Sequence, residues 1–81
     1  MFRTTQQRID MKTHSLKIES NYLDRIIDGS KQFEVRFNDR DFQVGDRLYF
    51  HESNIKVEIT YILHSFIGLK EGYVVLGIKL L

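Results

Sequence analysis

The chain of 81 residues contains no cysteine, no proline and no tryptophan. Because cysteine is absent, the chain can form neither a disulfide bond nor a metal site built from thiolates. It also has no long apolar run: the longest, residues 73–78, is far shorter than the roughly 20 residues that span a membrane. Residues 1–10 contain no apolar segment typical of a secretory signal. We therefore expect a cytoplasmic protein that does not associate with a membrane.

The chain also has little net charge. Twelve Lys and Arg residues oppose eleven Asp and Glu residues, which gives a formal net charge of +1. Residues 1–10 hold Arg3, Arg8 and Asp10, so residues 11–81 carry ten basic and ten acidic side chains. Strong non-specific nucleic-acid binders are visibly basic, because their affinity comes largely from neutralising phosphates. If this chain binds RNA or a nucleotide, we expect it to do so through a local site.

The length is that of one domain. Residues 1–10 are polar and weakly patterned, which predicts an N-terminal extension; a start codon assigned upstream of Met11 would explain them equally well. Residues 11–81 are clearly patterned, and we assign the domain to them. With 42% hydrophobic and 12% aromatic residues in the whole chain, a packed core is expected.

Hydrophobic periodicity predicts five strands and one helix. Apolar residues at helical spacing predict a helix over residues 21–28, with Ser20 or Asn21 as its N-cap and Gly29 ending it. A further helical turn is possible at 66–70. The predicted strands cover residues 13–19, 32–37, 47–52, 55–64 and 73–80.

The same alternation predicts which side chains form the core. The inward sets are Leu16 with His14, Phe33 with Val35 and Phe37, Leu48 with Phe50, and Val57 with Ile59 and Tyr61. The last strand is nearly all apolar, which is typical of a strand covered on both faces. Five strands in so short a chain would leave exposed edges if the sheet were flat. We predict an α+β fold: a small mixed β-barrel of about five strands with one or two short helices, one of them plugging an end.

A charged cluster stands where the helix meets the second strand. Lys31 lies at the junction, and Glu34 and Arg36 are two residues apart on one strand face, roughly 6–7 Å from each other. Arg can bind a phosphate or carboxylate with two parallel hydrogen bonds, Lys adds a point charge, and Glu can accept from base amino groups. The cluster suits a small polar ligand. Alternatively, Glu34 and Arg36 are neighbours on a solvated strand face, and their ion pair stabilises the fold by less than about 1 kcal/mol.

The run from Gly29 to Arg36 matches the G-x-K-x-x-E-x-R signature of the ASCH domain, a branch of the PUA-like superfamily. Residues 14–17, 38–46 and 71–76 extend the match, so the chain from Met11 onward resembles a compact ASCH-related branch of bacteria and phages. The resemblance implies a PUA-like β-barrel and a role in binding RNA or a nucleotide-like ligand. It makes Lys31, Glu34 and Arg36 the principal site candidates. His14 and Lys17 are secondary candidates, and Arg40 could add a phosphate contact.

Other motifs favour structural roles. The three histidines are widely spaced and make no metal-ligand pattern, and His14 falls on an apolar strand face, as a core or barrel-rim histidine would. The run 38–41 lacks the spacing of a calcium loop and is better explained as a turn. We therefore expect neither a metal nor another cofactor.

Some ASCH proteins are amidohydrolases that act on acetylated cytidine. In those enzymes the signature segment contains a Lys and, three residues later, a Thr, and a later strand supplies a Glu. Lys31 matches the Lys, but Glu34 replaces the Thr, and Glu52 or Glu58 is the available later acid. The nucleophilic hydroxyl is therefore missing. We predict a binding module rather than an enzyme; if the protein is an enzyme, Lys31 and Glu34 are its catalytic candidates. A protein-interaction module is a third possibility, and the sequence leaves the oligomeric state open.

Overall fold

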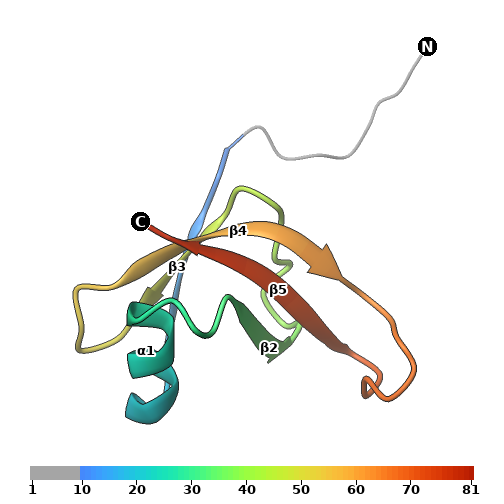
Figure 1. Cartoon of the computed structure of the whole chain (residues 1–81). Coiled ribbons are helices and arrows are strands. Elements are labelled where there is room, and N and C mark those ends of the chain that lie inside the picture. Colours follow the sequence, from blue (N-terminus) through green and yellow to red (C-terminus); the bar gives the residue numbers. More distant parts are fainter. Residues whose placement is uncertain (1–9) are drawn as a thin grey trace.

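The computed structural model describes residues 10–81, which form five strands and one helix (Figure 1). Apart from Asp10, the predicted extension lies outside the described residues. The elements are β1 (Thr13–Leu16), α1 (Ser20–Ile27), β2 (Phe33–Phe37), β3 (Arg47–Phe50), β4 (Lys56–Leu63) and β5 (Tyr73–Leu80). Each predicted strand and the predicted helix are therefore present, with ends that shift by a few residues.

The five strands form one mixed sheet in the order β1-β3-β4-β5-β2. The pair β1–β3 is parallel and the other three pairs are antiparallel. The sheet curls into a half-barrel, so the predicted α+β fold is confirmed. Its ring is not closed, because β1 and β2 are the two edges of the sheet. No helix in residues 10–81 is long and apolar enough to cross a membrane.

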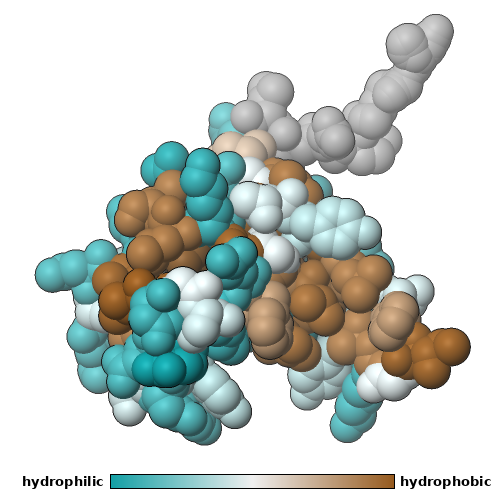
Figure 2. Space-filling model, viewed as in Figure 1, coloured by the Kyte–Doolittle hydropathy of each residue, from teal (hydrophilic) through white to brown (hydrophobic). Residues whose placement is uncertain are grey.

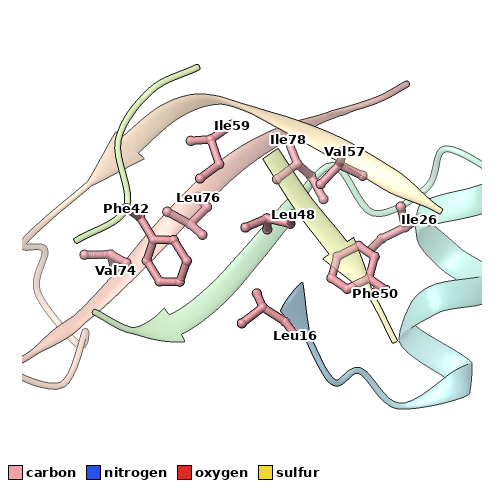
Figure 3. Packing of buried hydrophobic residues seen from close by; sticks show 10 residues of the cluster. All are labelled: Leu16, Ile26, Phe42, Leu48, Phe50, Val57, Ile59, Val74, Leu76 and Ile78. Carbon is pink, nitrogen blue, oxygen red and sulfur yellow. The ribbon is translucent and has the colours of Figure 1, made fainter. Parts of the chain in front are cut away.

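The hydrophobic core fills the concave side of the sheet (Figure 3). Helix α1 contributes one buried side chain, Ile26, and the loop before β3 contributes Phe42. The remaining core residues come from β1, β3, β4 and β5: Leu16, Leu48, Phe50, Val57, Ile59, Val74, Leu76 and Ile78. The predicted inward faces of β1 and β3 are confirmed.

The ends of α1 confirm one prediction and correct another. Gly29 follows the helix with φ +86°, a left-handed conformation that glycine adopts without steric cost. The predicted N-cap is wrong: Glu19 precedes the first turn in an extended conformation, and no side chain caps the helix. The carbonyl of Glu19 instead accepts backbone N–H groups from Tyr22 and Leu23.

Strand β2 turns the opposite face inward from the predicted one. Phe33, Val35 and Phe37 are 46–53% exposed, and Glu34 is only 5% exposed. The register explains this orientation, because Glu34 lies opposite the buried Leu76 of β5 and therefore shares its face. The prediction that these three apolar residues belong to the core is wrong.

Strands β4 and β5 correct two further predictions. The register between them shifts between Ile59 and Tyr61, and this β-bulge turns Tyr61 outward, where it is 63% exposed. Strand β5 fully buries alternate residues only, so one of its faces is half-buried rather than both being covered. Residues 66–70 form a turn closed by the Leu69 N–H to the Phe66 carbonyl, not a helix.

Apolar side chains therefore collect on the outside of one half of the sheet. Figure 2 shows them over β5 and β2 and toward the loop that connects β4 to β5.

Candidate functional site

A cleft of about 650 Å³ lies along the free edge of β2. Its second wall is the segment between β1 and α1, together with the first turn of the helix. The lining residues are Lys17, Ile18, Glu19, Tyr22, Lys31, Phe33, Glu34, Val35, Arg36, Phe37 and Tyr73. The cleft therefore occupies the seam that the half-barrel leaves between its two edges.

Glu34 is the buried centre of this cleft. Its carboxylate receives the Lys31 ammonium at Oε1 and the Arg36 guanidinium at Oε2, with Arg36 Nε at 2.8 Å and Nη2 at 2.7 Å. The side chains of Lys31 and Arg36 are themselves only 14% and 24% exposed. A buried charge must be paired. Because Lys31 and Arg36 both pair with the Glu34 carboxylate, β2 can turn its charged face inward.

Two arginines bridge the open seam. Arg36 Nη2 donates to the Lys17 carbonyl at 2.7 Å, and Arg40 Nη1 donates to the Ser15 carbonyl at 2.9 Å. Strand β1 uses its alternate carbonyls, such as that of Leu16, to pair with β3, so the carbonyls of Ser15 and Lys17 face the free edge. The arginines thus satisfy acceptors that a closed barrel would pair with a strand.

Aromatic side chains form part of the cleft walls. The Lys31 ammonium lies 4.8 Å from the centre of the Phe33 ring and 5.6 Å from that of Tyr22, within the range of cation–π attraction. Phe37 and Tyr73 meet edge to face at 5.5 Å. A planar ring entering the cleft would therefore find both cationic donors and aromatic surface.

The charges that line the cleft leave one positive charge in excess. Lys17, Lys31 and Arg36 oppose Glu19 and Glu34. Among residues 10–81, Arg36 Nη1 has no hydrogen-bond partner, so one side of the guanidinium keeps a spare donor. A second cavity of about 350 Å³, lined by residues that include Phe42 and His64, has no Asp, Glu, Lys or Arg in its lining. Of these two cavities, the cleft beside β2 is therefore the better site for an anion.

The structure brings together four of the six predicted site residues. Lys17, Lys31, Glu34 and Arg36 all line the cleft. Arg40 lies at the same seam but is engaged by the β1 backbone and is not among the lining residues. His14 lies elsewhere, in the core.

His14 belongs to a separate buried cluster. Its Nε2 lies 2.7 Å from the carboxylate of Asp46, which is fully buried and also accepts the backbone N–H groups of Lys12 and Gln43 at 3.0 and 3.1 Å. The ring of Phe42 packs edge-on against the imidazole at 4.9 Å. These contacts hold the loop before β3 against β1, which is the structural role expected for a core histidine.

Sequence reasoning missed the apolar wall of the cleft. Phe33, Val35 and Phe37 were predicted to be core residues, yet they line the outer side of the site. The later acids Glu52 and Glu58 do not line it. No group of three possible metal ligands exists within residues 10–81.

Comparison with known proteins places the chain in a family. The family model of a domain of unknown function, DUF3850, matches residues 13–78, so the chain belongs to that family. A relative in Escherichia phage P2, described as an uncharacterized 12.9 kDa protein in the GpA 3′ region, is 39% identical over 41 residues. That alignment covers 51% of this chain and 38% of the phage protein, so the chain matches well under half of its relative's length.

A solved structure shows the same fold. The crystal structure of the hypothetical protein PH0355 superposes with a TM-score of 0.69, covering 88% of this chain and 100% of that one. The sequences are 21% identical, a likeness that establishes the fold alone.

Proposed function

We propose that the chain is an ASCH-type member of the PUA-like superfamily and binds RNA or a nucleotide-like ligand in the cleft beside β2. The observation that carries the proposal is the burial of Glu34 between Lys31 and Arg36 inside a cleft with aromatic walls. Such a cluster combines an acceptor with two cationic donors, which is what a base and its phosphate or carbonyl groups require.

The charge of the cleft favours a ligand with about one negative charge. One positive charge is in excess, and Arg36, which lines the cleft, keeps a spare donor for a phosphate or carbonyl oxygen. The aromatic rings that line the cleft add a surface on which a base can stack, worth about 1–3 kcal/mol per base. The neutral balance of residues 11–81 is compatible with recognition at this one site rather than along an extended basic surface.

Thermal unfolding with short single-stranded RNAs and modified nucleosides tests the proposal. Lys31→Ala and Arg36→Ala are the cleft variants. Lys56→Ala and Arg47→Ala are their matched controls, because both are exposed strand residues outside the cleft. A ligand at 100 times its Kd should stabilise the wild type and the controls by about 2.7 kcal/mol, and the cleft variants much less. Folded cleft variants that respond like the wild type to every compound would refute the proposal.

A small hydrolase acting on a modified nucleoside is a second candidate. The observation in its favour is the contact of the Lys31 ammonium with the Glu34 carboxylate, a pair that could position and activate water. The test is incubation with N4-acetylcytidine and measurement of released cytidine. Turnover that Lys31→Met abolishes would establish the hydrolase, and the absence of release above a protein-free control would leave the binding function alone.

A further inference from the structure

The two edges of the sheet differ in how their backbone groups are satisfied. At the β1 edge, the carbonyls of Ser15 and Lys17 accept hydrogen bonds from arginine side chains instead of from a strand. At the β2 edge, the Phe33 carbonyl accepts the Lys31 ammonium at 2.6 Å, and the Phe37 carbonyl accepts the Asp39 N–H at 2.9 Å. Among residues 10–81, the N–H and C=O of Val35 have no hydrogen-bond partner.

The pairing with β5 fixes which groups of β2 face this edge. The Gln32 carbonyl accepts the Ile78 N–H, and the Asn38 N–H donates to the Gly72 carbonyl, so even-numbered residues of β2 bond to β5. The odd-numbered residues Phe33, Val35 and Phe37 therefore direct their backbone groups away from the sheet. Val35 is the position on this edge, within residues 10–81, where both backbone groups remain open, and β2 contains no proline, so another strand can pair there.

The sequence of β2 is self-complementary about Val35: identical residues, Phe33 and Phe37, lie two positions away on either side, and residues of opposite charge, Glu34 and Arg36, lie one position away. We propose that a second copy of this chain pairs antiparallel with the β2 edge, with Val35 on the twofold axis. Phe33 then lies opposite Phe37 of the second copy, and Glu34 opposite Arg36.

Charge selects this register from its neighbours. Hydrogen-bonded pairs across a twofold axis must join residues whose backbone groups face the edge, and the two registers next to the one at Val35 place the axis at residue 34 or residue 36. An axis at residue 34 sets Glu34 against Glu34, and an axis at residue 36 sets Arg36 against Arg36. Like charges directly opposite each other are destabilising. The axis at Val35 instead sets Glu34 of each copy against Arg36 of the other, so that opposite charges face each other.

This proposal does not depend on the proposed ligand. Because Val35 also lines the cleft, the second copy and a ligand are alternative occupants of the same edge. The dimer is therefore the state of the protein without ligand, and its pairing can be tested with the chain alone.

The absence of cysteine makes a crosslinking test specific. In the proposed register the two Val35 residues form a hydrogen-bonded pair, with Cα atoms about 5.5 Å apart. That separation lies within the roughly 4.4–6.8 Å that a disulfide spans, so Val35→Cys should crosslink under mild oxidation about tenfold faster than a control. Val44→Cys is the matched control, since Val44 is an exposed valine in a turn away from β2.

Sedimentation provides the second measurement. Wild-type protein should show a concentration-dependent dimer, and Val35→Pro should be monomeric, because proline cannot donate to an added strand. The variant's circular dichroism should remain that of the wild type, since this N–H bonds nothing within residues 10–81. Val35→Cys crosslinking no faster than Val44→Cys, or wild-type protein that stays monomeric up to about 1 mM, would overturn the proposal. Either result would show that the β2 edge does not pair with a second copy and is open to an extended segment of another protein.

Discussion

Strands β2 and β4 both alternate apolar and polar residues, but they present opposite halves of that pattern to the core. Strand β4 buries Val57 and Ile59, exposes Lys56 and leaves Glu58 half-buried, as the pattern predicts. Strand β2 buries Glu34 and leaves Val35 47% exposed. Alternation thus shows that a segment is a strand, but the side chains it meets decide which face is buried. In β2 the Lys31 and Arg36 partners make an inward carboxylate tolerable.

The largest expected effect comes from two matched valines. Val57 is fully buried in β4, and Val35 is exposed in β2. Val57→Ala should lower the free energy of unfolding by about 2–3 kcal/mol, because it removes two buried methyl groups and leaves a cavity. Val35→Ala should change it by less than about 0.5 kcal/mol in the monomer. Urea unfolding at low protein concentration measures the free energy of unfolding of both variants. Equal losses of stability would mean that Val35 is buried, as the sequence pattern alone predicts.

An intermediate effect is expected when the inward charge of β2 is removed. Glu34→Ala leaves Lys31 and Arg36 without their shared carboxylate. Breaking a fully buried ion pair costs about 3–5 kcal/mol, and the partial exposure of both cations reduces our expectation to about 1–2 kcal/mol. Glu19→Ala is the matched control, because Glu19 also lines the cleft but is exposed. If the two variants unfold at the same urea concentration, the charge cluster does not set the orientation of β2.

The smallest effect concerns the turn that leads from α1 into β2. Hydrogen bonds from the Ser30 hydroxyl and backbone N–H, at 2.6 and 2.8 Å, lower the pKa of Asp28 below 3.8, with a smaller contribution from Arg25. Because the folded pKa is depressed, the stabilisation is present above about pH 3.8 and is lost as pH falls through the folded value.

Asp28→Asn should therefore reduce the loss of stability on acidification below pH 3.8. Melting temperatures of the wild type and the variant across this range measure the difference. A variant that follows the wild type at every pH would show that this carboxylate contributes nothing to the turn.

These comparisons also show how far the sequence predicts the molecule. Periodicity located all five strands, and Gly29 marked the end of α1, because both signals depend on local geometry. The faces of β2 and the end of β4 could not be predicted in this way. The orientation of Glu34 depends on partners in the tertiary structure, and the bulge before Tyr61 reverses the alternation without a clear local signal.

The closeness of the charged residues was predicted from the sequence, whereas the burial of β2 was not. Lys31, Glu34 and Arg36 were expected to lie together because they are close in sequence, and they do. The opposite wall, from Lys17 to Tyr22, depends on how the half-barrel brings its two edges together. Apart from Lys17, which the resemblance to ASCH domains suggested, the sequence alone offered no signal for that wall.

The most direct measurement of the central claim is a nuclear magnetic resonance titration of the ¹⁵N-labelled protein with cytidine monophosphate, N4-acetylcytidine and a short single-stranded RNA. If the cleft binds a nucleotide-like ligand, at least one probe should shift the amide signals of β2 and residues 17–22, and Arg36→Ala should suppress those shifts while Arg47→Ala preserves them. Shifts confined to other surfaces, or none with any probe at millimolar concentration, would contradict the account.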